Sequence, residues 1–328
     1  MIISRTPFRV SFCGGGSDMK SFYRRSPGAV LSTTIDRYMY IMIHPYFHDK
    51  IRIKYSKLED VDRIRQIKHT IVRACLERLG IEKGIEIASI ADVPAGTGLG
   101  SSSAFAVGLL QALLAHQKKT CPKAFLAEEA CRVEIDILKE PIGKQDQYAA
   151  SFGGLNVIRF HPDGGVAVEP VACRPEVKRR LEKRLLLFYV GKERRAGRIL
   201  KVQSRNLSLR GYRDRMREMV RLTEEMRTAL LAGRLIRFAE ILHEGWMIKK
   251  TMAPDISDLN LDGLYARALE AGAVGGKLLG AGGGGFFLFY CPPKSQNDLR
   301  LALGLRELAF GFEKEGTKLI YREGPSND

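Results

Sequence analysis

Long hydrophobic runs are absent from this 328-residue sequence. A helix that crosses a bilayer needs about 20 consecutive apolar residues, and because no such stretch occurs we expect no membrane-spanning segment. The first residues also lack the apolar core behind a basic head that a secretory signal peptide requires. Low-complexity linkers and internal repeats are missing as well, and a hydrophobic content of 45% is ordinary for a folded chain. The sequence therefore predicts a folded protein without a membrane partner.

Paired cysteines are missing too. The six cysteines are scattered, with no Cys-x-x-Cys spacing and no histidine at metal-binding spacing. This distribution argues against a disulfide framework or a zinc site and predicts buried thiols in a reducing compartment. We expect a cytoplasmic protein.

Acidic residues are few beside the basic ones, since 37 Asp and Glu face 53 Lys and Arg for a formal net charge of +16. Residues 174–237 hold 20 of the basic and 7 of the acidic residues and so carry most of the excess. Such a segment can serve a nucleic acid, an anionic membrane or a phosphorylated small molecule, or it can form solvated helices. Because no zinc finger, KH loop or aromatic RNA-binding segment accompanies it, we favour solvated helices and expect no nucleic-acid partner.

Strand and helix patterns alternate in the first half of the chain, and the composition changes near residue 172. Hydrophobic periodicity predicts strands at 2–12, 28–45, 51–55, 84–91, 154–160, 166–171, 185–191, 286–290 and 317–322. It predicts helices at 60–79, 102–117, 123–139, 147–150, 176–184, 261–271 and 295–312, with two long polar helices between 191 and about 251. We expect two domains, 1–172 and 173–328.

The segment PAGTGLGSSSAFAV, residues 94–107, combines alternating glycines with three serines at the start of an apolar helix. A helix N-terminus exposes unpaired N–H groups, and glycines let backbone N–H groups close around phosphate oxygens. No lysine follows the last glycine, so this is not a Walker A loop. A serine-capped core helix is the alternative, but the repeated glycines favour a phosphate cradle.

A second glycine cluster, GGKLLGAGGGGFFLFY at 275–290, contains the spacing G-x-G-x-x-G. A dinucleotide site needs a strand before these glycines and a helix after them, whereas here a strand follows. The interpretation that remains is a tight loop beside a ligand, with a plain hairpin connection as the alternative.

Near the N-terminus, Gly14, Gly15 and Gly16 interrupt a strand pattern, and Ser17 and Asp18 follow. Three consecutive glycines are entropically unfavourable unless something approaches the backbone closely.

Two acidic residues are candidate functional groups. Glu134 falls on the apolar stripe of the helix expected at 123–139, whose other members are Ala127, Ala130, Cys131, Ile137 and Leu138. A carboxylate aimed at the core can hold Mg²⁺, lie at the edge of the stripe or pair with a buried arginine, and the residues alone leave these equal. Asp146, in GKQDQ, can accept a proton from a hydroxyl or cap the short helix that follows.

Taken in order, TPFRVSFCGGGSD, PAGTGLGSSSA and KLLGAGGGGFF resemble the three motifs of the GHMP kinases, which phosphorylate small molecules. The likeness covers nearly the whole chain. It implies an α+β fold, with a ribosomal S5-like N-terminal domain, a ferredoxin-like C-terminal domain and the site between them. ATP and Mg²⁺ are the implied cofactors, and a monomer or homodimer is expected.

The resemblance also implies residue roles. The ATP phosphates would be held by Gly96, Gly98, Leu99, Gly100, Ser101, Ser102, Ser103 and Ala104. Ser102 and Glu134 would hold Mg²⁺, Asp146 would act as the general base, and Arg9 would lie near the transferring phosphate. Sugar contacts would come from Gly14, Gly15, Gly16, Ser17, Asp18, Gly283 and Gly284.

Within the family, the first motif and the segment GAVLSTTIDRYMYI at 28–41 are most similar to kinases of D-glycero-D-manno-heptose 7-phosphate. The implied reaction is phosphorylation of the anomeric hydroxyl of this sugar phosphate, in the synthesis of nucleotide-activated heptose for surface polysaccharide. Arg195, in the basic stretch GKERRAGR, would reach the sugar phosphate. Other sugar 1-kinases, for fucose, mannose or galactose, are the alternative, and a basic protein that binds RNA or anionic surfaces is the alternative of another class.

Overall fold

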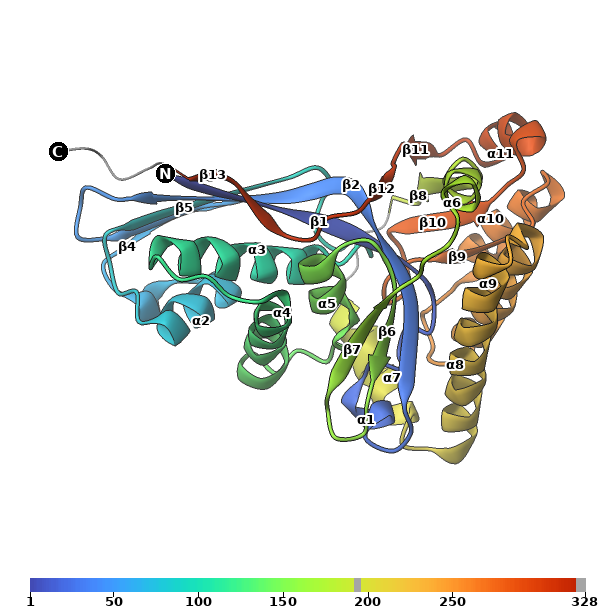
Figure 1. Ribbon diagram of the computed structural model, residues 1–328, viewed down its shortest axis with the longest axis horizontal. Coiled ribbons are helices and arrows are strands. Elements are labelled where there is room, and N and C mark those ends of the chain that lie inside the picture. Colours follow the sequence, from blue (N-terminus) through green and yellow to red (C-terminus); the bar gives the residue numbers. More distant parts are fainter. Residues whose placement is uncertain (192–195, 323–328) are drawn as a thin grey trace.

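Two β-sheets organise the computed structural model, which describes residues 1–191 and 196–322 (Figure 1). The larger sheet has nine strands in the order β13-β1-β2-β5-β3-β4, with β6 and β12 paired to β2 and β7 paired to β6. Its strands are β1 (Ile2–Cys13), β2 (Gly28–Pro45), β3 (Ile51–Lys54), β4 (Leu58–Val61), β5 (Ile85–Ala91), β6 (Leu155–Phe160), β7 (Val166–Pro170), β12 (Phe312–Glu313) and β13 (Lys318–Arg322). The mixture of helices with mainly antiparallel sheets confirms the α+β class.

Helices from the first half of the chain cover one face of the larger sheet, as Figure 1 shows. They are α2 (Thr70–Leu79), α3 (Ser101–His116), α4 (Lys123–Cys131) and α5 (Gln145–Phe152). A short helix, α1 (Lys20–Tyr23), follows the first strand. Thirteen of the sixteen residues of α3 are buried, which is why its sequence is apolar all round rather than on one stripe.

Strand β2 holds the larger sheet together, because it pairs with β1, β5, β6 and β12. Its first eight residues are all buried, and the outer part then alternates between buried and half-exposed positions. Burial on both faces produces a continuous apolar run, and burial on one face produces alternation. The predicted bounds of this strand, 28–45, are confirmed.

The second half of the chain forms a four-stranded antiparallel sheet in the order β11-β8-β10-β9. Its strands are β8 (Leu185–Tyr189), β9 (Gly275–Leu278), β10 (Phe286–Tyr290) and β11 (Arg306–Leu308). Helices separate β8 from β9 and β10 from β11, so the chain follows the β-α-β-β-α-β path of ferredoxin-like domains. This confirms the expected C-terminal fold.

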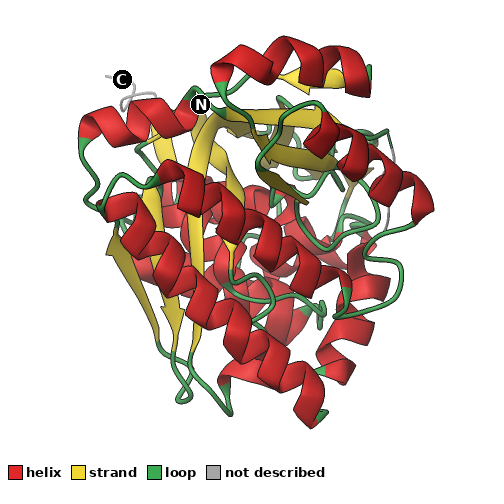
Figure 2. Ribbon diagram, turned by 90° about the vertical axis from the view of Figure 1, so that its right-hand side faces the viewer, coloured by secondary structure: helices red, strands yellow, loops and turns green. Residues whose placement is uncertain are grey.

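Figure 2, viewed from the right-hand side of Figure 1, shows long helices in front of strands. The helices of the second half are α6 (Pro175–Glu182), α7 (Ala196–Asn206), α8 (Arg210–Leu231), α9 (Leu235–Lys250), α10 (Leu259–Glu270) and α11 (Gln296–Leu303). Between residues 191 and about 251 the sequence pattern predicts two long helices, whereas the described residues of this region form three, α7, α8 and α9. None of the described helices is long and apolar enough to cross a membrane.

The C-terminal strands return to the larger sheet. β12 pairs with β2, and β13 pairs with β1 beside the N-terminus (Figure 1). The proposed boundary near residue 172 falls in the connection between β7 and α6. The division into domains 1–172 and 173–328 stays a proposal. Strands β12 and β13 belong to the second domain by sequence but pair with strands of the first.

The predicted helices at 60–79 and 295–312 are too long. Residues before α2 form β4 and a 3₁₀ turn, η1 (Ile64–Gln66), because the buried carboxylate of Glu59 accepts hydrogen bonds from the backbone N–H groups of Lys68 and His69. Helix α11 ends at Gly304, whose φ of +60° favours glycine, and the chain continues as β11. A second 3₁₀ turn, η3 (Pro293–Ser295), precedes α11.

The three consecutive glycines after β1 differ in what surrounds them. Gly14 has a φ of +89°, and a Cβ there would lie 1.9 Å from the backbone oxygen of Ala29. Gly16 has a φ of +105°, and its Cβ would lie 2.4 Å from Nε2 of Gln203. For Gly15 the nearest atom would be 3.5 Å away, so this position has room for a methyl group. Tight packing within the protein therefore requires two of the glycines.

We predict that two neighbouring substitutions in this loop differ in their effect on the free energy of unfolding. Gly14→Ala places a methyl group against the β2 backbone at a positive φ and should lower the free energy of unfolding by about 2–4 kcal/mol. Gly15→Ala, the matched control, should stay within about 1 kcal/mol of the parent. Urea denaturation measures both, and equal stability of the two variants would contradict this account of the loop.

Candidate active site

A cavity of about 590 Å³ lies where the two halves of the molecule meet. Its wall combines the loop after β1, the glycine-rich loop before α3, the start of α5, the end of α9 and the loop after β9. Among the residues predicted to form the site, the structure places these in the wall: Arg9, Gly15, Gly16, Asp18, Gly96, Gly98, Gly100, Ser101, Ser102, Ser103, Glu134, Asp146 and Gly284.

Arg9 and Asp146 form a two-pronged ion pair in this cavity. The Arg9 Nε donates to Oδ1 of Asp146 at 2.7 Å, and Nη2 donates to Oδ2 at 2.8 Å. The Nη1 of Arg9 donates to the backbone oxygen of Gly98 at 2.6 Å. A fork of this kind fixes both side chains. Lys144, not Asp146, occupies the N-cap position of α5, so the helix-capping alternative for Asp146 is wrong.

Glu134 is the second carboxylate of the site. It is 1% exposed, its Oε1 accepts a hydrogen bond from Oγ of Ser102 at 2.7 Å, and its Oε2 accepts one from Nε2 of Gln147 at 2.6 Å. Burial raises the pKa of this carboxyl above its ordinary value. The predicted inward direction is confirmed, while the alternatives of an edge position and of a buried arginine partner are wrong.

A change of helix type explains why one member of the predicted stripe, Ile137, is not buried, whereas Ala127, Ala130 and Cys131 are buried and Leu138 packs partly buried against the core. Helix α4 ends at Cys131 and continues as a π-helix, η2 (Arg132–Ile137), in which the N–H of Leu138 donates to the oxygen of Val133. The five-residue spacing of this bond shifts later side chains around the axis, so that Ile137 is 44% exposed instead of buried. Such π-turns are frequent at functional sites.

The two glycine-rich loops pack against each other by backbone contact. A Cβ on Gly98 would lie 2.6 Å from the oxygen of Leu279, and one on Gly280 would lie 2.5 Å from the Cα of Gly98. A Cβ on Gly285 would lie 2.3 Å from the oxygen of Thr97. The glycines at 280 and 285 therefore allow contact with the first loop. The cluster also connects β9 to β10, an antiparallel pair, as the hairpin alternative expected, and a strand rather than a helix follows it.

The loop before α3 carries the features of an anion site. Gly96, Gly98 and Gly100 have φ values of +78°, +84° and +77°, which only glycine adopts readily. Helix α3 begins at Ser101, and its N-cap glycine makes no side-chain hydrogen bond to the first turn. The N–H groups of that turn are therefore available for an anion in the cavity.

Asp18 lies in the wall of the same cavity. Its Oδ1 accepts hydrogen bonds from the N–H of Gly16 at 2.8 Å and from Nε2 of Gln145 at 3.2 Å, and Oδ2 accepts from the N–H of Gln145 at 3.1 Å. Burial raises the pKa of this carboxyl. Next to it, Oγ of Ser11 and Oε1 of Gln145 have no hydrogen-bond partner in the described part of the chain, although both are buried. Unpartnered buried polar atoms indicate a ligand with hydroxyl groups.

Five predicted contacts are not part of the cavity wall: Gly14, Ser17, Leu99, Ala104 and Gly283. Gly14 packs on β2, and Oγ of Ser17 bonds to both the N–H and the oxygen of Ala29. Leu99 and Ala104 are buried in the core. The N–H of Gly283 donates to the oxygen of Ile256. Arg195 lies outside the described residues.

Two lysines of the cavity wall, Lys249 and Lys277, were missed by sequence reasoning. A signal for Lys249 exists, because it follows Leu242 and Trp246 on the buried stripe of α9, just as Glu134 follows its apolar neighbours. Lys277 lies among glycines on β9, a strand that the sequence pattern did not reveal.

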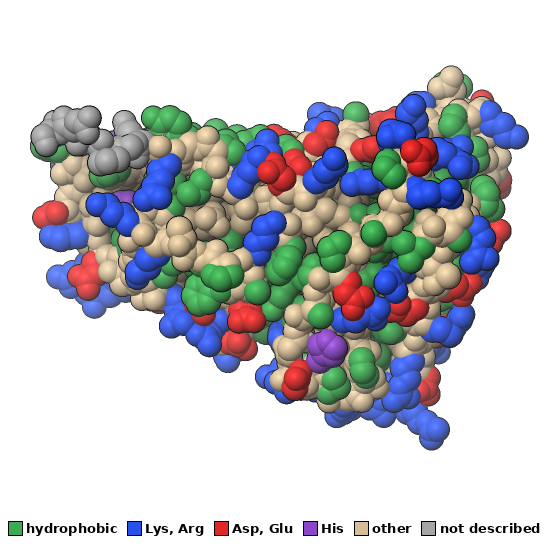
Figure 3. Space-filling model, in the orientation of Figure 1, with side chains coloured by type: hydrophobic (Ala, Val, Ile, Leu, Met, Phe, Trp, Pro, Cys, Tyr) green, Lys and Arg blue, Asp and Glu red, His purple; other side chains and the backbone are tan. Residues whose placement is uncertain are grey.

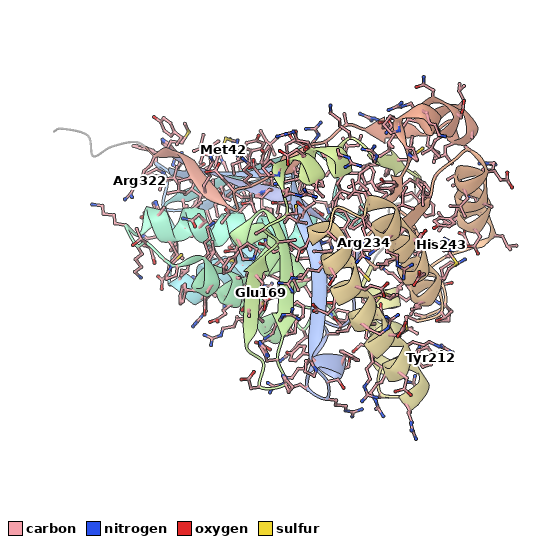
Figure 4. The ribbon with its side chains drawn as sticks, turned by 45° about the vertical axis from the view of Figure 1, so that its right-hand side comes forward. Met42, Glu169, Tyr212, Arg234, His243 and Arg322 are labelled. Atoms are coloured by element: carbon pink, nitrogen blue, oxygen red, sulfur yellow. The ribbon has the colours of Figure 1, made fainter. Side chains whose placement is uncertain are left out.

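The arginines of α8 and α9 are largely engaged with carboxylates, as Figure 3 suggests by the mixture of both charges on the visible face. Arg221 pairs with Glu218 and Glu225, and Arg237 pairs with Glu225, Glu240 and Glu244. Arg159 of β6 bridges Glu169, labelled on β7 in Figure 4, to Glu224 of α8. These pairs support the interpretation of solvated helices.

Comparison with known proteins assigns both halves to one family. The model for the GHMP kinases N terminal domain matches residues 66–154, and the model for the GHMP kinases C terminal matches residues 226–306. These are 89 and 81 of the 328 residues, just over half of the chain.

Individual relatives extend the match to the full length. A D-glycero-alpha-D-manno-heptose 7-phosphate kinase of Campylobacter jejuni is 29% identical, with 97% of this chain and 98% of the relative covered. The crystal structure of a D-glycero-D-manno-heptose 1-phosphate kinase from Bacteroides thetaiotaomicron gives a TM-score of 0.80 at 25% identity, covering 99% and 100% of the two chains. Streptococcus pneumoniae phosphomevalonate kinase, at 16% identity, shares the fold with a TM-score of 0.76 over 95% of this chain and 100% of the other.

Proposed function

The chain belongs to the GHMP kinases, and we propose that it transfers the terminal phosphoryl group of ATP to the C1 hydroxyl of D-glycero-D-manno-heptose 7-phosphate. The observation that carries the proposal is the Arg9–Asp146 pair, which lies in the cavity wall and contacts the loop before α3 through the bond from Arg9 to the oxygen of Gly98. The product would be the 1,7-bisphosphate, a precursor of nucleotide-activated heptose for surface polysaccharide.

Asp146 accepts the proton of the acceptor hydroxyl, or orients that hydroxyl for attack, in the proposed reaction. Its bonds to Arg9 fix the carboxylate in position. The guanidinium has five N–H donors and uses three of them within the protein. The other two can stabilise charge on the transferring phosphoryl group.

The loop before α3 binds the phosphates of the nucleotide. Backbone N–H groups of the loop and of the first helical turn, with the hydroxyls of Ser101 and Ser103, supply donors at the positive end of the α3 dipole. Close packing of this loop on Gly280 keeps its shape without a ligand. A preformed cradle costs little ordering entropy on binding.

Ser102 and Glu134 are suited to Mg²⁺. The Oγ of Ser102 and the Oε1 of Glu134 are 2.7 Å apart, beside the loop before α3. Oxygen atoms of this kind are the ligands that Mg²⁺ prefers. A two-residue donor set fits an ion that takes its other ligands from phosphates and water. When bound, the ion would neutralise charge on the nucleotide phosphates.

Support for a sugar acceptor comes from the part of the cavity wall around Asp18. Asp18, Ser11 and Gln145 place carboxylate, hydroxyl and amide oxygens around Gly15, where there is room for a ligand. Such a surface suits a polyhydroxylated molecule. The names of the relatives support a heptose phosphate, although they place its phosphate on different carbons.

A panel of acceptors tests the proposal directly. We expect ADP formation with ATP, Mg²⁺ and heptose 7-phosphate, and at least about a hundredfold lower kcat/KM with heptose 1-phosphate, unphosphorylated heptose, fucose, mannose and galactose. Activity on the unphosphorylated sugars alone would contradict a heptose phosphate as the acceptor and would favour a kinase of another sugar. Absence of ADP with every sugar, together with tight and salt-sensitive RNA binding, would favour a basic binding protein instead.

Asp146→Asn should fold and bind ATP but lose about 10²–10⁴-fold in kcat, because the amide cannot accept the hydroxyl proton. Steady-state kinetics and nucleotide binding measure the two effects separately. Asp136→Asn is the matched control, since Asp136 lies on an exposed face of the same region and should retain activity. A kcat within a few-fold of the parent would remove Asp146 from the mechanism.

Glu134→Gln should raise the Mg²⁺ concentration for half-maximal activity by on the order of tenfold, because one charged ligand is lost. The neutral amide can still accept a hydrogen bond from Ser102, so we expect the melting temperature to stay close to that of the parent. A Mg²⁺ titration at saturating ATP gives the result. An unchanged titration curve in a folded variant would exclude Glu134 as a ligand.

A further inference from the structure

Two lysine side chains are buried in the cavity wall without a carboxylate partner. Lys249, in the last turn of α9, is 7% exposed, and Lys277, on β9, is 5% exposed. Within the described ranges neither takes part in an ion pair, whereas Lys250, the next residue along α9, pairs with Asp262 at 3.0 Å. A buried charge without a partner is costly, so its presence in a cavity calls for an explanation.

Each ammonium group is fixed by one backbone oxygen. Nζ of Lys249 donates to the oxygen of Gly280, and Nζ of Lys277 donates to the oxygen of Phe12 at 3.1 Å. An ammonium has three donors, so two on each lysine remain for a ligand. The backbone oxygens thus fix the positions of the two ammonium groups but provide no negatively charged partner.

The other charged groups that face this pair do not supply a free anion. Arg9 adds positive charge from β1, and its guanidinium already holds both oxygens of Asp146. The carboxylate of Asp18 accepts three N–H bonds from its own loop and from Gln145. Cys13, the remaining titratable neighbour of Lys277, has its pKa raised by burial and stays a neutral thiol at neutral pH.

Both lysines line the cavity that also holds the loop before α3 and Asp18. Lys249 reaches Gly280, which packs on Gly98 of that loop. The charge of Lys277 acts on Lys249, so the two ammonium groups lie near each other in this cavity. An anion bound by both would lie in the cavity that holds the proposed nucleotide and acceptor sites.

We propose that Lys249 and Lys277 form a cationic pair that binds a phosphoryl oxyanion and takes up a proton as it does so. The oxyanion comes from the terminal phosphate of the nucleotide or from the phosphate of the acceptor. This assignment rests on the proposed kinase function, but its test does not require turnover.

Proton uptake follows from the environment of the pair. Burial lowers the pKa of Lys277 to about 8, and burial with the charge of Lys277 lowers the pKa of Lys249. A bound anion favours the charged ammonium and raises both pKa values. The contribution of Lys277 to binding is then complete below about pH 8, where this lysine is already protonated in the free protein, and it falls by up to about tenfold per pH unit above that value.

The test is calorimetry of the intact protein at about pH 9, in two buffers with different protonation enthalpies. The probes are the ATP analogue AMPPNP, heptose 7-phosphate, and unphosphorylated heptose as the neutral match. We expect proton uptake with at least one phosphate probe and none with the neutral sugar. Uptake with AMPPNP alone assigns the pair to the nucleotide, and uptake with the sugar phosphate alone assigns it to the acceptor.

Substitutions of the two lysines test which of them takes up the proton when the anion binds. Lys249→Met and Lys277→Met keep the side-chain length without the charge and should weaken binding of that probe by about 10–100-fold at pH 7. Lys277→Arg should retain affinity at pH 7 and show a flatter pH dependence, since arginine does not lose its proton. Lys250→Met, the matched control on the same helix, should leave both quantities unchanged.

The proposal is overturned when neither phosphate probe takes up protons in the parent protein, a result that does not depend on how the variants fold. It is also overturned when folded Lys→Met variants retain the parent affinity and uptake. Proton-linked binding of AMPPNP without phosphorylation of any sugar would sustain the lysine assignment while contradicting the proposed acceptor.

Discussion

The ion pair between Arg9 and Asp146 is the interaction on which the site depends. One guanidinium joins three separate elements, because it lies on β1, holds the carboxylate at the start of α5, and bonds to the oxygen of Gly98. The side chain of Arg9 is 6% exposed, so these bonds form in a poorly solvated environment where each is stronger than at a surface. A carboxylate held in this way does not need to be reorganised when a ligand arrives. The same bonds fix the distance between Asp146 and the loop before α3.

Glycine serves this site mainly by letting backbone approach backbone. Gly98, Gly280 and Gly285 close the contact between the loop before α3 and the loop after β9, which come from different sheets. Gly14 does the same between the loop after β1 and β2. Any side chain at these positions would separate the two halves of the cavity. The glycine clusters therefore set the width of the cavity, and only some of their members face the space within it.

Much of the fold followed from the sequence, since β2 and α3 carry long, consistent hydrophobic patterns, and the inward direction of Glu134 followed from helical spacing. Other features depend on contacts that no local pattern encodes. The π-turn after α4 shifts Ile137 to the surface, and the hydrogen bonds of buried Glu59 prevent an early start of α2. Strand β9 is hidden because its glycines contribute no periodicity. The pairing of Asp146 with Arg9, 137 residues away, could not be read from the flanks of either residue.

The basic segment 174–237 supplies most of the net charge, and among its described residues Arg198 of α7 lines the cavity. Arginines such as Arg221 and Arg237 are paired with glutamates of α8 and α9. Arg9, Lys249 and Lys277 are instead buried in the cavity wall, where Arg9 pairs with Asp146 while neither lysine takes part in an ion pair within the described ranges. Exposed ion pairs contribute little energy, whereas a buried lysine without a partner is costly to keep charged. A protein tolerates that cost where the partner is a ligand. Burial without a protein partner is therefore a better indicator of an anion site in this chain than a run of basic residues.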